Sequence, residues 1–171
     1  MPMVESSITI QATPDILFAL SQDYYLRKDW DPFVAGIRFL DGATRPAPGV
    51  RVWVKSWQGL EMITEYVTVV PPKRVAVKML DGPPFFETFG GAWRFEPTAP
   101  GETRVHFRYS FRSRWRMLRP VLDPVIRLIF GRDIRARLRG LKRAVADTDI
   151  AARLGADGPA QGRQAPERFD G

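Results

Sequence analysis

A series of short alternating segments joined by tight turns is the feature that most constrains the fold of this chain. Between residues 34 and 113, apolar and polar side chains alternate with a period of two, and turn residues such as Gln58-Gly59 and Asp81-Gly82 interrupt the pattern. This pattern predicts β-strands. We expect them at 4–11, 34–40, 50–57, 60–70, 75–80, 85–96 and 103–113. Consecutive strands with short connections form an antiparallel sheet.

Helical signals lie on either side of this strand-rich region. Thr13-Pro14-Asp15 is typical of a helix N-terminus and predicts a short helix ending near residues 21–23, followed by a second at 24–29. Near the other end, Asp123-Pro124 repeats the signal and predicts the start of the main helix. Its apolar stripe has helical spacing: Val125, Ile129, Ile134, Leu138, Leu141 and Val145. Gly131 within it predicts a bend or a close backbone contact.

These elements predict a single α+β domain. Only one long helix is available to cover a large antiparallel sheet, so the sheet must curl around that helix. We assign this domain to residues 1–149. From residue 150 the composition shifts to Ala, Gly, Pro, Gln and charged residues, which predicts a disordered tail at 150–171.

Composition excludes several kinds of chemistry. The chain has no Cys, so it forms no disulfide and has no thiol nucleophile, and its single His, His106, cannot form a histidine metal cluster. His106 also alternates with the apolar residues of its strand, so we expect it on the outer face of the sheet, away from a catalytic triad. No phosphate-binding loop or nucleotide fingerprint is present. The sequence therefore predicts neither a metal nor a cofactor.

Charge and hydropathy suggest the environment. No secretory signal and no apolar run long enough to span a bilayer is visible, which predicts a soluble, cytoplasmic protein. The net charge is +7, and thirteen Arg and Lys face only two acids, Asp123 and Asp133, between Arg104 and Arg143. Such a basic region is either a solvated helix face or a surface for anionic lipid or an acidic protein. Nucleic-acid binding is not expected, because it needs aromatic and basic residues interleaved on one exposed face, and Arg112-Ser113-Arg114-Trp115-Arg116 is the nearest approach to that pattern.

Several segments together resemble one superfamily. The resemblance lies in 8–20 (ITIQATPDILFAL), in Trp30-Asp31-Pro32-Phe33, in Pro48-Gly49 before a strand, and in the turns at 71–75 (PPKRV) and 101–105 (GETRV). In order and spacing, the chain resembles the START/polyketide cyclase/dehydrase and lipid transport (SRPBCC) superfamily over residues 4–147. The resemblance implies a helix-grip (START-like) fold with an internal cavity. It fixes no reaction, because members include lipid carriers, aromatase/cyclases, ubiquinone-binding proteins and chaperone activators.

Strand alternation predicts which side chains face this cavity. In 103–113 the inward set is Val105, Phe107, Tyr109 and Phe111, and in 85–96 it is Phe85, Glu87, Phe89, Gly91, Trp93 and Phe95. A carboxylate among aromatic rings must be paired or neutralised. Glu87 is therefore a candidate for a ligand contact, an acid/base group or a partner of an Arg, unless a bulge near Gly90-Gly91 turns it outward.

Other candidate residues have two interpretations each. Glu65 faces the cavity in one phase of strand 60–70 and solvent in the other. Trp30 either plugs the cavity mouth or is a plain core aromatic, and the loop 81–86 is either a gate or an ordinary hairpin. The candidate catalytic residues are Glu87, Tyr109 and Glu65. The predicted ligand-binding residues are Trp30, Phe85, Glu87, Phe89, Trp93, Phe107, Tyr109, Phe111, Leu122, Val125, Ile126 and Ile129.

Three functions are consistent with this sequence. The favoured one is binding, and transfer, of a small hydrophobic molecule such as a lipid, isoprenoid or polyketide. The alternative is a cyclase or dehydratase acting in the same cavity without a metal or nucleotide. The third is a membrane- or protein-interaction module that uses Trp53, Trp57 and the Arg-rich helix. The ligand, the oligomeric state and the pathway stay open.

Overall fold

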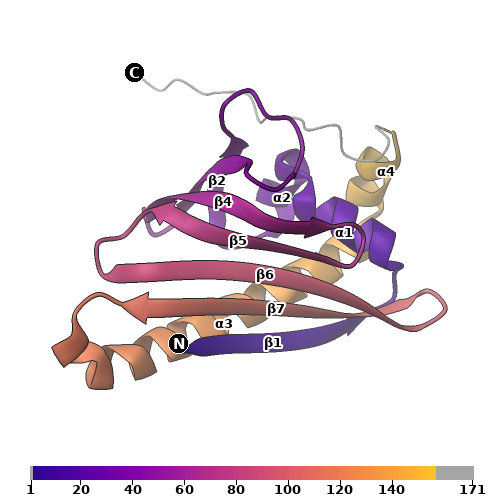
Figure 1. Cartoon of the computed structure of the whole chain (residues 1–171). Helices are drawn as coiled ribbons and strands as arrows, with labels where there is room; N and C mark the ends of the chain where they lie inside the picture. The colour runs from indigo at the N-terminus through magenta and orange to yellow at the C-terminus, as the bar shows by residue number, and fades with distance from the viewer. Residues whose placement is uncertain (1, 157–171) are drawn as a thin grey trace.

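The computed structural model describes residues 2–156 and is built on one seven-stranded antiparallel sheet (Figure 1). Its strands lie in the order β1-β7-β6-β5-β4-β3-β2, so β1 completes the sheet at the edge of β7. The strands are β1 (Met3–Ile10), β2 (Val34–Phe39), β3 (Arg51–Ser56), β4 (Glu61–Val70), β5 (Arg74–Asp81), β6 (Phe86–Ala99) and β7 (Glu102–Ser113). The predicted antiparallel meander is confirmed.

Two short helices connect β1 to β2, as predicted. In α1 (Pro14–Gln22) the Thr13 hydroxyl accepts a hydrogen bond from the Ile16 N–H at 3.5 Å. Asp23 ends α1 and begins α2 (Tyr24–Trp30), where its carboxylate accepts the N–H groups of Tyr25 at 3.0 Å and Leu26 at 3.1 Å. This single Asp therefore satisfies the backbone donors of the second helix and keeps the two helices adjacent.

The long helix α3 (Arg119–Ala146) crosses the concave face of the sheet (Figure 1). It begins four residues before the predicted start at Asp123, because Pro120 lies in its first turn, where a missing N–H is tolerated. Pro124 lies inside the helix and removes one hydrogen bond near the helix start without ending it. A 3₁₀ turn, η1 (Arg116–Leu118), links β7 to α3.

The predicted boundary of the tail is wrong at residues 150–156. These residues belong to a further helix, α4 (Thr148–Ala156). Asp147 caps it by accepting the N–H groups of Asp149 at 2.9 Å and Ile150 at 3.2 Å, and the Ile150 side chain is buried. Arg153 anchors it through an ion pair with Asp29 of α2 at 2.8 Å. The remainder of the predicted tail lies outside the described residues.

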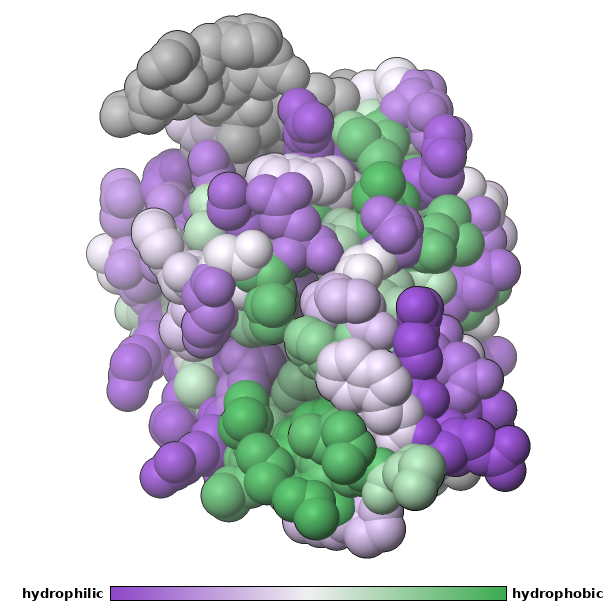
Figure 2. All heavy atoms as spheres, turned by 90° about the vertical axis from the view of Figure 1, so that its left-hand side faces the viewer, coloured by the Kyte–Doolittle hydropathy of each residue, from purple (hydrophilic) through white to green (hydrophobic). Residues whose placement is uncertain are grey.

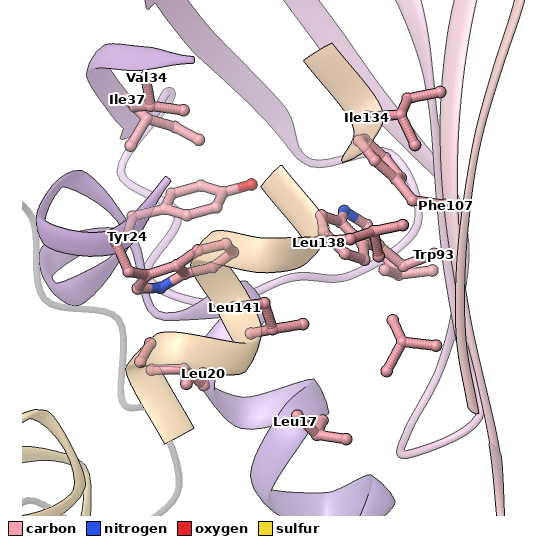
Figure 3. Packing of buried hydrophobic residues seen from close by; sticks show 14 of the residues in the cluster. Leu17, Leu20, Tyr24, Val34, Ile37, Trp93, Phe107, Ile134, Leu138 and Leu141 are labelled. Carbon is pink, nitrogen blue, oxygen red and sulfur yellow. The ribbon is translucent and has the colours of Figure 1, made fainter. Parts of the chain in front are cut away.

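The core lies between α3 and the concave face of the sheet. The four predicted inward residues of β7, Val105, Phe107, Tyr109 and Phe111, are all buried. Figure 3 shows Ile134 and Leu138 of α3 directed toward Phe107 and Trp93 of the sheet. The alternation of β7 and the stripe of the C-terminal half of α3 thus form one continuous core.

At Gly140, α3 lies very close to the end of α2. A Cβ at this position would lie 2.3 Å from the Trp30 carbonyl oxygen, so only glycine fits between α3 and α2. At Gly131, where the sequence predicted a bend or close contact, a Cβ would meet Val4 at 3.8 Å, an ordinary contact distance. The glycine that sets the position of α3 relative to α2 is therefore Gly140.

Candidate functional site

A cavity of about 80 Å³ lies between α2, α3 and the concave face of the sheet. Most of its wall is apolar and comes from every strand except β1, together with the α2–β2 connection. Those apolar residues are Phe33, Val34, Ile37, Val54, Met62, Val75, Val77, Phe89, Trp93 and Phe107. Apart from Thr64, the polar side chains that line it belong to two clusters, one charged and one of neutral hydroxyl and amide groups.

Aromatic rings from β6 and β7 form one wall of the cavity. Trp93 and Phe107 are direct cross-strand partners, and their rings stack with centroids 4.0 Å apart. Tyr109 packs edge-on against Phe107 at 4.9 Å and against Phe89 at 5.1 Å. Side chains that face each other across antiparallel strands meet in this way on one face. The wall therefore offers flat aromatic surfaces to a bound molecule.

The charged cluster, defined as Arg27, Asp31 and Arg137, is buried at the edge of this wall. One Asp31 oxygen, Oδ2, accepts from Arg27 Nε at 3.0 Å, from Arg137 Nη2 at 2.8 Å and from Arg137 Nε at 3.2 Å. Its other oxygen, Oδ1, accepts the Phe33 N–H at 3.1 Å. Two buried guanidinium groups thus share one buried carboxylate, and both line the cavity.

Local structure explains how these three residues meet. Arg27 and Asp31 are four residues apart at the end of α2, the spacing at which helical side chains face each other. Arg137 lies on α3 between Ile134 and Leu138, on the face that packs against the sheet. Its guanidinium stacks on Phe33 and on Phe107, each at 4.8 Å from the ring centroid. A delocalised guanidinium between aromatic faces is the form of cation that tolerates burial best.

The electrostatics keep Asp31 ionised. Burial by itself would raise the pKa of Asp31, but attraction from Arg137 and Arg27 and hydrogen bonds from Arg27 and the Phe33 N–H outweigh it, so the pKa lies below its usual range. Burial likewise opposes the charge of Arg137, and Asp31 more than compensates and raises the pKa of that guanidinium. Asp31 and Arg137 are therefore both charged at neutral pH.

Tyr109 extends the charged cluster toward the edge of α3. Its hydroxyl accepts from Arg137 Nη1 and donates to Asp133 Oδ2 at 2.9 Å. Burial raises the pKa of Tyr109, so its hydroxyl stays protonated. Burial also raises the pKa of Asp133, although Arg137 and the Tyr109 hydroxyl act in the opposite direction. Tyr109 therefore places a protonated hydroxyl, next to a carboxylate, on the cavity wall.

The neutral cluster, Gln22, Tyr24 and Tyr66, also lines the cavity. The Tyr66 hydroxyl donates to Gln22 Oε1 at 2.8 Å and is itself hydrogen-bonded to the Tyr24 hydroxyl. Burial raises the pKa of both tyrosines, which keeps them neutral. The side-chain amide of Gln22 extends this series of hydrogen bonds by donating to the Ser21 hydroxyl at 2.9 Å. This cluster provides uncharged groups that can donate or accept.

The structure brings together only some of the predicted ligand-binding residues. Phe89, Trp93, Phe107 and Tyr109 line the cavity. Trp30 is buried against Trp93 with ring centroids 6.5 Å apart and does not line the cavity, as in the interpretation of a core aromatic. Two further predicted residues belong to the aromatic core beside the cavity: Phe85, which is partly buried, and Phe111, which is fully buried.

The four predicted contacts on α3 lie away from the cavity. Val125 and Ile129 are 50% and 56% exposed, and Leu122 and Ile126 are partly buried but do not line it. The stripe was interpreted as covered along its whole length. The sheet covers α3 only from about Phe130 onward, so the earlier turns of the stripe face solvent or the edge of the core.

Two candidate acids prove to face outward. Glu87 is exposed and pairs with Arg119 at 3.2 Å, because a bulge between Phe86 and Thr88 shifts the register there. A bulge near Gly90-Gly91 was predicted to turn Glu87 outward. The observed bulge has this effect but lies at Glu87 itself, three residues before Gly90. Glu65 pairs with Lys78 at 3.1 Å on the outer face, since Met62, Thr64 and Tyr66 take the inward phase of β4.

His106 lies on the outer face, as the alternation predicted. Its ring nitrogens lie 3.3 Å from carboxylate oxygens of Glu5 and Glu96. Trp53, also predicted to face outward, packs beside Gly36, and Arg38 covers its ring at 5.1 Å. Among the described residues, no cluster of His, Cys, Asp and Glu has the arrangement of a metal site.

Sequence reasoning missed Arg27, Asp31, Arg137 and Asp133. Arg137 could have been found, because it follows Ile134 by three residues and precedes Leu141 by four, which puts a charge inside the apolar stripe. Asp31 follows Arg27 by four residues, which predicts their pairing. The contact between Asp31 and Arg137 spans 106 residues, and no local pattern indicates it.

A curved antiparallel sheet that grips one long helix around an internal cavity defines a helix-grip protein. The family described as polyketide cyclase / dehydrase and lipid transport matches residues 1–146, so this chain belongs to that family. The match extends over the whole sheet and all of α3. A comparison with curated proteins gives no significant match.

Solved structures share the fold at low sequence identity. A START superfamily protein from Mycobacterium smegmatis is 16% identical with a TM-score of 0.71, over 84% of this chain and 97% of that one. The Zhui aromatase/cyclase from Streptomyces sp. R1128 is 16% identical with a TM-score of 0.70, over 92% and 98%. The di-domain ARO/CYC BexL of the BE-7585A biosynthetic pathway is 17% identical with a TM-score of 0.70, over 85% and 47%. These likenesses establish the START-like fold.

Proposed function

We propose that this protein binds a small, mostly apolar molecule that carries at least one oxygen acceptor, in the cavity between α2, α3 and the sheet. The observation that carries this proposal is the pairing of an aromatic wall with buried donors. Trp93 and Phe107 offer flat apolar surfaces, and Arg137 and Tyr109 border them. Such a mixture of apolar wall and a few convergent polar groups is typical of small-molecule sites.

The arrangement of donors favours a carbonyl, hydroxyl or carboxylate on the ligand. The guanidinium groups of Arg27 and Arg137 can only donate, whereas the Tyr24, Tyr66 and Tyr109 hydroxyls can donate or accept. All of these groups line the cavity. A pure hydrocarbon would leave the donors without new partners, so an oxygenated molecule such as a polyketide, a quinone or a fatty acid fits the chemistry better.

The size of the cavity implies that binding is coupled to movement. A volume of about 80 Å³ is far below the roughly 300–1,000 Å³ of typical ligand pockets. A lipid- or polyketide-sized molecule must therefore displace side chains of the wall. Met62 is suited to this, because it is unbranched and lines the cavity near the start of β4.

Native mass spectrometry of the purified protein, followed by solvent extraction, tests the proposal without assuming a ligand. Expected is a co-purifying oxygenated apolar molecule. Whether or not one is found, a fatty acid, a quinone and a polycyclic aromatic ketone can be titrated while tryptophan emission is followed, since Trp93 lies in the wall. If no species co-purifies and none of the three changes the emission, the proposal fails.

Matched variants locate the site. Tyr109→Phe removes only one hydroxyl from the cavity wall, and Tyr25→Phe makes the same change on α2 at a residue that does not line it. A lost hydrogen bond is worth about 0.5–1.5 kcal/mol. We therefore expect Tyr109→Phe to weaken binding by up to about tenfold and Tyr25→Phe to leave it unchanged. Equal effects of the two would place the site elsewhere.

A second candidate function is a cyclase or dehydratase in the same cavity, and the contact between Tyr109 and Asp133 favours it. Of the three candidate catalytic residues, only Tyr109 lines the cavity. Its protonated hydroxyl could donate a hydrogen bond to a ligand carbonyl, and the Asp133 carboxylate, 2.9 Å from that hydroxyl, could take up a proton that the reaction releases. In that case Tyr109→Phe would abolish turnover of an identified substrate while binding persisted. Unchanged turnover would exclude the enzyme that we describe.

Other properties keep the status of predictions. None of the helices within residues 2–156 combines the length and the apolar character that crossing a bilayer requires. A cytoplasmic location, the absence of a cofactor and the absence of nucleic-acid binding are predictions from the sequence. They can be checked by fractionation and by mass spectrometry of the intact protein.

A further inference from the structure

Most of the large apolar side chains that are exposed gather at one end of the molecule. In the sheet register, Trp57 in the β3–β4 turn, Leu80 near the end of β5 and Trp115 after β7 all lie at the same end, because Lys55 pairs with Glu61, Ile63 with Asp81, and Phe86 with Ser113. The first turns of α3 begin there. Figure 2 faces this end and shows a continuous hydrophobic area in its lower part, flanked by hydrophilic residues.

We use the name end surface for the exposed apolar residues at this end and define it by Trp57, Leu80, Trp115, Met117, Val121 and Leu128. Met117 is 94% exposed, Trp57 70% and Val121 69%. Met117 lies in η1, and Val121 and Leu128 lie on the part of α3 that the sheet does not cover. A continuous exposed hydrophobic area such as the one in Figure 2 is typical of an interaction site.

The charges around the helical part of the end surface are mostly basic, whereas Glu61, beside the β3–β4 turn, and Asp81, beside Leu80, are acids at the same end of the sheet. Arg112, Arg114, Arg116, Arg119 and Arg127 surround the helical part, and Asp123 is the only acid from residue 112 to 132. The Asp123 carboxylate is engaged by the Ser113 hydroxyl at 2.7 Å, and Glu87 lies against Arg119 and Arg112. Within residues 2–156, Arg114, Arg116 and Arg127 form no ion pair with a carboxylate. The helical part of the surface thus carries uncompensated positive charge.

From this combination we infer that the end surface docks on a bilayer that contains anionic lipid. Apolar side chains surrounded by Arg insert at the boundary between headgroups and acyl chains, and Trp residues favour the same depth. Arginine attracts acidic headgroups. A second copy of this chain fits less well, because a two-fold contact would bring the same arginines against each other.

Docking of this kind has a consequence for the cavity. Phe33, Val54 and Met62 line the cavity and lie near the end surface, since β2 begins and β3 ends at this end of the sheet. The bilayer would then lie next to the nearest wall of the cavity. The inference goes beyond ligand binding and does not depend on it.

Vesicle flotation with the full chain tests the inference. Vesicles of phosphatidylcholine alone are compared with an equal mixture of phosphatidylcholine and phosphatidylglycerol, at about 0.1 M and about 1 M salt, between which the Debye length falls from about 10 Å to about 3 Å. Expected is strong binding to the mixture at low salt, weak binding at high salt and weak binding to phosphatidylcholine. Equal binding to both vesicles, or none, overturns the inference.

Variants separate the two contributions. Arg114→Gln with Arg116→Gln should lower the partition coefficient about 30-fold, since each basic residue near an anionic surface contributes a factor of about five. Met117→Ser with Val121→Ser should lower it about tenfold or more. The control is Arg139→Gln with Arg143→Gln, two exposed arginines in the second half of α3, which should bind like wild type.

Two outcomes of the variant series overturn the inference. Loss of binding in the Arg139 and Arg143 control equal to that in the Arg114 and Arg116 variant would mean that net charge alone acts. A dimer that forms in solution and dissociates with Met117→Ser and Val121→Ser, without vesicle binding by wild type, would assign the end surface to a second copy. Thermal melting of each variant checks that it is folded. All of the substituted residues are exposed, so we expect each variant to fold.

Discussion

Replacing Asp31 with Asn tests whether the buried charged cluster holds α2 against α3. Among residues 2–156, Asp31 is the only carboxylate that bonds to both Arg27 and Arg137, and it does so through one oxygen, Oδ2. An amide cannot reproduce this arrangement. If the Asn oxygen faces the arginines, its NH₂ faces the Phe33 N–H, which in the wild type donates to Asp31 Oδ1. If it is turned around, its NH₂ meets two guanidinium groups, and donor faces donor in both orientations.

The expected cost is large. Asp31→Asn leaves two cations that are almost fully buried, with side-chain exposures of 8% and 6%, without their shared counter-charge. Breaking a buried ion pair by removing one partner costs about 3–5 kcal/mol. The total stability of a domain is about 5–15 kcal/mol. We therefore expect Asp31→Asn to remove a large part of the stability of this protein.

Urea denaturation followed by circular dichroism measures this effect, with two further variants for comparison. Arg137→Met leaves Arg27 and Asp31 as a one-to-one pair and should cost less than Asp31→Asn. In Asp31→Asn alone, Arg27 loses its carboxylate partner and Arg137 keeps only Asp133, at 3.9 Å. The double variant Asp31→Asn with Arg137→Met removes the second of these buried cations. It should therefore be more stable than Asp31→Asn alone. Arg139→Met, an exposed arginine two residues further along α3, should change stability by less than about 0.5 kcal/mol.

The dependence of stability on pH provides a second readout. Because the pKa of Asp31 is lower in the folded protein than in the unfolded chain, its ionised form favours folding above the unfolded pKa of about 3.9. That contribution disappears as the pH falls through the folded pKa. Asp31→Asn should flatten this part of the acid-unfolding curve. A loss of stability below 1 kcal/mol with an unchanged acid profile would refute the role of the cluster.

Three further predictions follow from single contacts. Gly140→Ala should lower the free energy of unfolding, measured in urea, by at least about 1–3 kcal/mol, because the new Cβ would lie 2.3 Å from the Trp30 carbonyl oxygen. Gly131→Ala is the matched control, since its Cβ would have its nearest contact at 3.5 Å, and it should not be destabilising. Thr103→Val should cost about 1–3 kcal/mol in the same assay by leaving the Ala12 carbonyl, which accepts from the Thr103 hydroxyl at 2.7 Å, without that donor. Ile150→Ala should release α4 and raise hydrogen exchange in that helix alone; unchanged exchange would contradict its anchoring role.

The sheet could be predicted from the sequence because its signals are local. Alternation with a period of two and Gly or Pro turns specify each strand, and consecutive strands then pair without further information. The predicted phase failed where pairing became irregular. At Glu87 a bulge turns one side chain outward, and nothing in the alternation of 85–96 indicates at which residue the bulge lies. The outward direction of Glu87 is therefore a property of the β6–β7 pairing.

The C-terminal region shows a different limit. Its apolar stripe gave the correct helix and the residues that meet the sheet, such as Ile134 and Leu138. However, a stripe cannot show where the covering sheet ends. Val125 and Ile129 were therefore predicted to line the cavity, although both are exposed. The same residues that were misassigned as cavity wall now lie beside the proposed membrane-docking surface. Apolar periodicity identifies a face of a helix and does not identify what covers it.

The contacts between polar residues of the cavity could not be derived from local patterns, and they carry the proposed function. Tyr66 and Gln22 are 44 residues apart, and Arg137 and Asp31 are 106 apart, so each hydrogen bond exists only because the sheet closes around α3. Buried charges are costly unless they are paired, and here one carboxylate pairs two arginines that also face the cavity. An apolar ligand pocket would need neither. The persistence of these charges in the core is thus the strongest physical reason to expect a ligand with oxygen atoms, and a hydrocarbon bound as tightly as its oxygenated analogue would contradict it.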